Sequence, residues 1–145
     1  MQAGSMDVER RLDELGLTLP AGAVLPAGVE IHFAWVRVRG DRAFVSGHGA
    51  LAPDGSPAGP FGKVPGDLTL EEAQHSARLA TLAVLASLKT VLGDLDRVSA
   101  WLMVNGYVNA EPGYPHTTAV MNSCSELIID LYGTDAGSHA RTAIG

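Results

Sequence analysis

Cysteine, positive charge and long apolar runs are all scarce in this sequence. Cys124 is the only cysteine, so the chain can form no internal disulfide and offers no cysteine pair to zinc. Ten basic side chains stand against sixteen acidic ones, and the net charge of −6 disfavours a nucleic-acid partner. No stretch approaches the ~18 consecutive apolar residues of a membrane span, and the opening residues lack a secretory-signal pattern. We therefore expect a cytoplasmic protein that binds neither membrane nor nucleic acid.

Motifs for metals and nucleotide cofactors are also missing. The glycines form neither GxGxxG after a strand nor GxxxxGK[ST], which excludes the common dinucleotide and triphosphate cradles. The five histidines show neither HxH nor HExxH spacing, and no carboxylate cluster completes a ligand set. We expect no metal site and no cofactor. The length of 145 residues predicts one domain, residues 1–145.

The first half of the chain predicts a helix and a hairpin, followed by a long helix. Apolar residues at helical spacing favour a short helix over 7–15. Segments 30–39 and 42–48 are rich in Val, Ile, Phe and Trp, and the two residues between them, Gly40 and Asp41, suit a type II′ hairpin. After an irregular loop over 49–66, a capping-box pattern at Thr69 and Glu72 begins a helix that we expect to extend to residue 92.

The second half alternates strand, helix and strand. We expect a strand over 97–108, a helix over 114–132 with Pro115 in its first turn and Gly133 at its end, and a strand from 138 to 144. This order predicts an α+β protein with a mixed or antiparallel sheet and two main helices on one face.

One face of this predicted sheet remains uncovered. Trp101, Met103 and Tyr107 share a row on the strand over 97–108, and such large side chains would form an apolar patch in water. Self-association through that face would bury them, so we expect a homo-oligomer.

Arg141 is the leading candidate for a ligand-binding residue. It lies near the start of the last strand, where a guanidinium could clamp a carboxylate through two charge-assisted hydrogen bonds; a solvated surface arginine is the alternative. His48, beside Gly47 and Gly49 at a strand end, is the best candidate for acid/base chemistry, although a capping or surface role is open. Ser46 lacks a GxSxG context for a nucleophile, and Cys124 lies on an apolar helix stripe.

Four segments of the chain resemble the Rid family, also called YjgF or reactive intermediate deaminase. They are RLDELGLTLP from residue 11, FVSGHGAL from 44, VLGDLDRVSAWLMVNGYV from 91 and HARTAIG from 139. The resemblance implies a chorismate-mutase-like α+β fold and a homotrimer whose sheets form a central barrel with ligand clefts between subunits. It also implies that Arg141 binds the carboxylate of a 2-imino or enamine acid, which water hydrolyses to a 2-oxo acid and ammonia.

The sequence departs from the family's pattern around this site. Phe33 replaces a tyrosine, Ala143 replaces a cysteine two residues after Arg141, and His48 stands where a glutamine is common, while Ser46 is retained. The family's final strand, which carries a water-positioning glutamate in the deaminases, would follow Gly145.

Three functions are compatible with these residues. The first is hydrolysis of 2-imino or enamine acids, in which Arg141 anchors the carboxylate, Ser46 and Gly47 hold the substrate, and His48 assists proton transfer. The second is a specialised cyclase or isomerase for a reactive biosynthetic intermediate, suggested by the apolar Phe33 and Ala143. The third is a non-catalytic module that binds small carboxylates. The acidic charge disfavours the ribonuclease activity attached to some family members.

Overall fold

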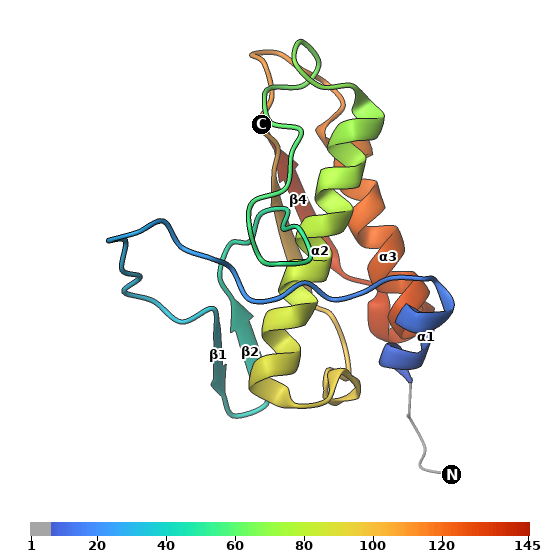
Figure 1. Ribbon diagram of the computed structural model, residues 1–145. Coiled ribbons are helices and arrows are strands. Elements are labelled where there is room, and N and C mark those ends of the chain that lie inside the picture. The colour runs from blue at the N-terminus through green and yellow to red at the C-terminus, as the bar shows by residue number, and fades with distance from the viewer. Residues whose placement is uncertain (1–6) are drawn as a thin grey trace.

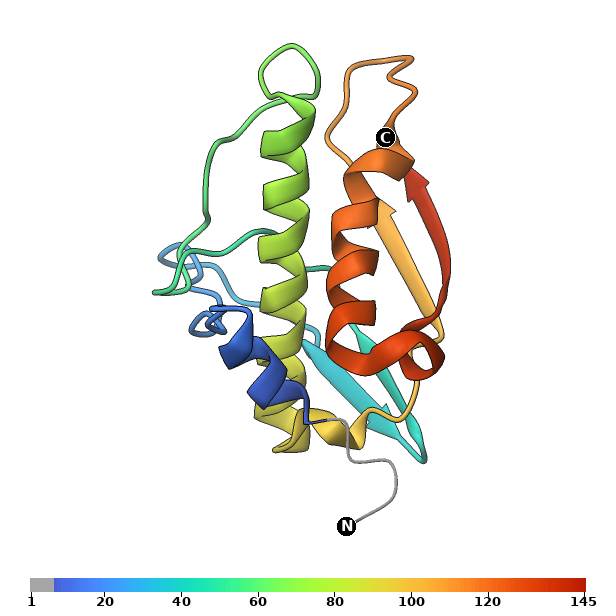
Figure 2. The ribbon, with the colours of Figure 1, turned by 90° about the vertical axis from the view of Figure 1, so that its right-hand side faces the viewer.

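Helices lie on one side of the molecule and strands on the other, as two views at right angles show (Figures 1 and 2). The computed structural model describes residues 7–145; residues 1–6, which belong to the segment searched for a secretory signal, lie outside the described part. The elements, in chain order, are α1 (Val8–Glu14), β1 (Val36–Arg39), β2 (Arg42–Val45), α2 (Leu70–Leu92), the 3-10 helix η1 (Leu95–Arg97), β3 (Met103–Tyr107), α3 (Thr117–Gly137) and β4 (Ala140–Ile144).

The short N-terminal helix forms where the sequence predicts it. Its apolar side chains, Val8 and Leu12, are buried. The Val8 N–H donates to a carboxylate oxygen of Asp96 at 2.9 Å, so a residue of η1 satisfies one of the free N–H groups at the start of α1.

The hairpin is confirmed, with shorter strands than predicted. β1 and β2 pair antiparallel, and Arg39 lies opposite Arg42. Gly40 has a φ of 60°, while Asp41 is not among the non-glycine residues with positive φ, which agrees with a type II′ turn. Beyond the strands, the Ser46 N–H still donates to the Trp35 carbonyl at 2.9 Å.

Helix α2 confirms the capping prediction. The Glu72 N–H donates to Thr69 Oγ1 at 3.1 Å, and the Thr69 N–H donates to Glu72 Oε1 at 3.0 Å. Gly93 follows the helix with a φ of 81°.

The predicted strand over 97–108 is shorter in the structure. It begins at Met103, because η1 occupies its first residue and the segment that follows η1 is irregular. The prediction for Trp101 was therefore wrong: its ring packs edge-on against Tyr132 at 5.6 Å between centroids, on the core side. Met103 and Tyr107 do face outward, with 53% and 75% of their surface exposed.

Helix α3 also differs at its ends from the prediction. It begins at Thr117 with His116 as N-cap, so Pro115 precedes the helix instead of occupying its first position. Gly133, with φ 82° and ψ 168°, interrupts the helix, and a further helical turn follows before Gly137. The predicted apolar stripe is confirmed, since all of its members are buried: Val120, Cys124, Leu127, Ile128 and Leu131.

The strands form two separate pairs instead of one continuous mixed sheet. β1 and β2 are antiparallel, whereas β3 and β4 are parallel, with Val104 opposite Arg141. Both main helices lie on the same side of these strands (Figure 2). The predicted arrangement of two helices on one face is therefore confirmed, but the hydrogen bonding of residues 7–145 does not join the two pairs.

The core lies between the helices and the strands. Its most deeply buried side chains come from α1, α2, η1 and α3, together with one residue of the loop before α2: Val8, Leu85, Leu95, Leu127, Ile128, Leu131 and Val64. Within residues 7–145, none of the helices has the length and apolar character needed to cross a membrane.

Candidate functional site

Arg141 lies on the side of β4 that faces helix α3. Side chains along β4 alternate between half-buried and exposed, and Arg141 and Ala143 are the two half-buried ones. Arg141 Nη1 donates to Ser125 Oγ at 2.9 Å, and Nη2 donates to the Thr118 carbonyl at 3.3 Å. These bonds use two of the N–H groups of the guanidinium, and its other N–H groups have no partner among residues 7–145.

Ser125 also contacts His139, which the sequence did not single out as a functional residue. His139 Nε2 lies 2.9 Å from Ser125 Oγ, and His139 Nδ1 lies 2.7 Å from the Gly137 carbonyl oxygen. All three side chains, those of Ser125, His139 and Arg141, are half-buried. The one sequence signal that could have pointed to His139 was its position two residues before Arg141, which places both residues at the start of β4.

Cys124 precedes Ser125 in α3 and is buried. Burial raises the pKa of its thiol, and a hydrogen bond with Thr81 and the charge of Arg141 offset only part of that increase. The thiol is therefore held in its neutral form, which agrees with the packed, unreactive role predicted from its helix stripe.

His48 points toward helix α2. Its Nδ1 lies 2.7 Å from the Ser46 carbonyl oxygen, and its Nε2 lies 2.8 Å from Ser87 Oγ. A carbonyl only accepts, so Nδ1 carries a proton, and in the neutral ring Nε2 is then the acceptor for the Ser87 hydroxyl. The ring also packs against Trp35 at 5.0 Å between centroids. Both ring nitrogens of His48 are thus occupied by partners within the chain.

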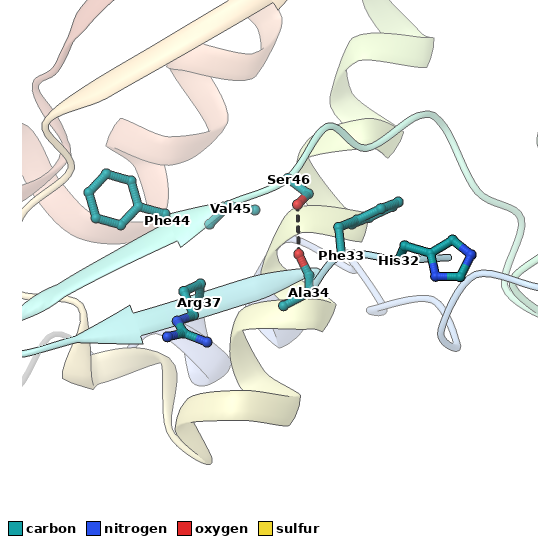
Figure 3. A pocket seen from close by; sticks show the side chains of 7 residues that line it. All are labelled: His32, Phe33, Ala34, Arg37, Phe44, Val45 and Ser46. Atoms are coloured by element: carbon teal, nitrogen blue, oxygen red, sulfur yellow. Dashed lines mark hydrogen bonds between the residues drawn. The ribbon is translucent and has the colours of Figure 1, made fainter. Parts of the chain in front are cut away.

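Phe33 and Ser46 line an open hollow on the hairpin (Figure 3). The hollow is formed by His32, Phe33, Ala34, Arg37, Phe44, Val45 and Ser46. Ser46 Oγ donates to the Ala34 carbonyl at 2.6 Å, which leaves its lone pairs to accept from a ligand. A Cβ built on Gly47 would meet no atom within 4 Å, so a ligand can approach its backbone.

The predicted site residues therefore form two groups within the chain. The first group lies along the hairpin and its extension and consists of Phe33, Ser46, Gly47 and His48. The second group belongs to β4, in the other strand pair, and consists of Arg141 and Ala143. The hollow on the hairpin does not include Arg141 or His48. Ala143 faces the core, and its carbonyl accepts a hydrogen bond from Thr117 Oγ1 at 3.0 Å.

No cluster of three or more His, Cys, Asp or Glu side chains suited to a metal ion occurs within residues 7–145. The two groups of candidate residues contain a guanidinium, a hydroxyl, an imidazole and backbone amides.

Comparison with solved structures places this architecture in the class of YjgF-like α+β proteins. Atu1372 from Agrobacterium tumefaciens, a protein of unknown function, matches with a TM-score of 0.83 and 33% identity over 98% of this chain and 84% of its own. A Shewanella oneidensis MR-1 protein described as a "putative endoribonuclease" matches with a TM-score of 0.82 and 27% identity, over 94% of this chain and 86% of its own.

A sequence relative is also found among curated proteins. Protein TCP17 from Trypanosoma cruzi is 34% identical over 139 residues, which cover 95% of this chain and 82% of TCP17. The chain therefore belongs to the same family as TCP17. No protein-family model matches the sequence.

Proposed function

We propose that the protein is a Rid-type enzyme that hydrolyses reactive 2-imino or enamine acids to 2-oxo acids and ammonia. The observation that carries this proposal is the state of Arg141. Its guanidinium is half-buried and donates two hydrogen bonds to acceptors of α3, yet it retains N–H groups without a partner among residues 7–145. A guanidinium in this state can bind a carboxylate through paired, charge-assisted hydrogen bonds.

Hydrolysis of the C=N bond requires a water molecule and a substrate that is held in a fixed orientation. Water adds to the carbon of the C=N bond, the nitrogen takes up protons, and the C–N bond then breaks to release ammonia and the 2-oxo acid. Anchoring the carboxylate fixes the position of the neighbouring imine carbon, and holding both reactants in place lowers the entropic part of the barrier. Arg141 would supply this anchoring.

We further propose that the cleft is completed by a second subunit of a homotrimer. The outward faces of both strand pairs expose large side chains that water would disfavour: Phe44, Met103, Tyr107 and Ile144. Burying these faces in a central barrel would remove the apolar patch. Packing of one subunit against the next would also place the hairpin hollow of one chain next to Arg141 of another.

The hairpin residues would form the opposite wall of this cleft. Ser46 has lone pairs available, Gly47 exposes its backbone, and Phe33 supplies an apolar surface that is 50% exposed in the single chain. His48 would take part in proton transfer only after its bond to Ser87 opens. In its observed state it fixes the backbone of Ser46 by accepting from α2 and donating to the Ser46 carbonyl.

Ammonia release from freshly generated 2-iminobutyrate tests the proposal. The wild type is expected to exceed the buffer rate, and Arg141→Ala to lose that excess. Arg10→Ala is the matched control, because Arg10 is an exposed arginine of α1 that pairs with Asp7 at 2.9 Å, away from β4. A wild type no faster than buffer, or an Arg141→Ala variant as fast as wild type, contradicts the proposal.

A non-catalytic carboxylate-binding module is the second candidate, and the occupied nitrogens of His48 favour it over a proton-transfer enzyme. Calorimetry with 2-oxobutyrate and benzoate distinguishes the two. Binding that depends on Arg141, in a protein that does not accelerate ammonia release, identifies the module. One structural neighbour, from Shewanella oneidensis, is designated an endoribonuclease, and incubating the present protein with RNA tests whether it shares that activity. Degradation of RNA by the wild type that the Arg141→Ala variant loses would establish ribonuclease activity instead.

A further inference from the structure

Ser125 holds Arg141 through a hydroxyl whose direction is set by His139. The carbonyl of Gly137 can only accept, so His139 Nδ1, at 2.7 Å from it, carries a proton. In the neutral ring the other nitrogen, Nε2, is then an acceptor. The Ser125 hydroxyl therefore donates to Nε2 across 2.9 Å, and its lone pairs receive the N–H of Arg141, also across 2.9 Å.

These contacts form one chain in which every donor points the same way. The guanidinium of Arg141 donates to Ser125, Ser125 donates to His139, and His139 donates to the Gly137 carbonyl. Each hydrogen bond in such a chain polarises the next one. The hydroxyl of Ser125 is consequently a better acceptor for Arg141 than an isolated serine would be.

Another serine of the same helix shows what His139 changes. Ser123 also lies on α3, but its hydroxyl contacts only backbone carbonyls, those of Gln74 at 2.8 Å and Val120 at 3.0 Å. The contact with Val120, three residues earlier, is usual for a serine inside a helix, and the contact with Gln74 joins α3 to α2. The hydroxyl of Ser125 instead contacts two side chains, those of His139 and Arg141.

We propose that Ser125 and His139 are positioning residues for Arg141, and that they set the affinity of the site for a carboxylate. The inference rests on the proposed function, because it assigns these residues to the same anchoring guanidinium. The other bond of Arg141, from Nη2 to the Thr118 carbonyl, is longer at 3.3 Å, so the contact with Ser125 contributes most to the orientation of the side chain.

Calorimetric titration with 2-oxobutyrate and steady-state kinetics with 2-iminobutyrate test the inference on the full-length protein. Ser125→Ala and His139→Ala are each expected to raise the Kd for 2-oxobutyrate about 10-fold, the scale of a lost hydrogen bond to a charged group. KM is expected to rise by a similar factor with kcat changed less than about 3-fold, because the guanidinium of Arg141 is still present in these variants to orient the substrate once it is bound.

Conservative variants separate positioning from a general structural role. Ser125→Thr keeps the hydroxyl, and His139→Gln keeps an acceptor where Nε2 lies, so both should bind 2-oxobutyrate within about 3-fold of wild type. Ser123→Ala is the matched control, since it removes a hydroxyl from the same helix without touching Arg141, and should leave Kd unchanged.

The outcomes distinguish the two proposals. If Arg141→Ala abolishes binding but Ser125→Ala and His139→Ala do not weaken it, the positioning role is overturned while the anchoring role of Arg141 stands. If His139→Gln binds as poorly as His139→Ala, the acceptor at Nε2 is irrelevant and the inference is again overturned. If Arg141→Ala binds 2-oxobutyrate as tightly as wild type, the proposed function itself fails and the positioning role fails with it.

Discussion

Removing the hydroxyl of Tyr132 should lower the free energy of unfolding at neutral pH. It should also make that free energy fall less when the pH is raised into the alkaline range. Tyr132 is 3% exposed, and its hydroxyl donates to the Leu95 carbonyl at 2.8 Å. Tyr132→Phe deletes this buried hydrogen bond, but the Leu95 carbonyl still accepts from the Val98 N–H at 3.2 Å. We therefore expect a free energy of unfolding about 1–2 kcal/mol lower than that of wild type at pH 8.

The difference should shrink as pH rises. Burial, followed by the negative charge of Asp96, raises the pKa of Tyr132 above its ordinary value of 10.0. Because the folded pKa is the higher one, the unfolded chain loses its proton first, and the stability contributed below pH 10 is lost as pH rises above the unfolded value. Wild type should lose about 1.4 kcal/mol by pH 11 through this residue, and the phenylalanine variant should not.

Urea denaturation followed by circular dichroism at pH 8 and pH 11 measures both effects, at one fixed protein concentration. Tyr107→Phe is the control, because Tyr107 is 75% exposed and lies on the uncovered strand face. A stability difference between wild type and Tyr132→Phe that stays constant from pH 8 to pH 11 would refute the reasoning, since it would mean that the folded protein ionises Tyr132 as easily as the unfolded chain does.

Two further predictions concern the long helices. Thr69→Ala removes one side of the capping box at the start of α2, and should cost about 1 kcal/mol and lower the Tm by about 2–4 °C; an unchanged Tm in a thermal scan would show that the cap contributes nothing. Cys124 should react with an aromatic disulfide reagent much more slowly in the native protein at pH 8 than in urea, because it is buried and its pKa is raised; equal rates would contradict the packing of α3.

Local sequence signals predicted those elements whose cause is local. The hairpin follows from Gly40 and Asp41 between two segments rich in β-branched and aromatic residues, and α2 follows from its capping pair and its apolar repeat. The row of Met103 and Tyr107 was predicted correctly because side chains alternate along a regular strand. Trp101 was misplaced because the alternation starts only at Met103, and the turn of η1 before it could not be seen in a period-2 pattern.

The candidate residues could be selected from the sequence, but their arrangement could not. Arg141 was selected from its place at a strand end and from the family resemblance, and the structure puts it against α3. Ser125 and His139 were missed because they are 14 residues apart and meet only through the packing of β4 on α3. His48 was selected as a candidate for acid/base chemistry, but its orientation depends on Ser87 of α2, a contact across 39 residues that no local pattern encodes.

A crystal structure of the protein with 2-oxobutyrate tests the central claim most directly. We predict that the carboxylate oxygens lie about 2.7–2.9 Å from guanidinium nitrogens of Arg141, the range of charge-assisted hydrogen bonds, with Ser125 and His139 still bonded behind it and Phe33 and Ser46 of a neighbouring subunit facing the same ligand. A carboxylate bound elsewhere, with Arg141 contacting only Ser125 and Thr118, would contradict the account.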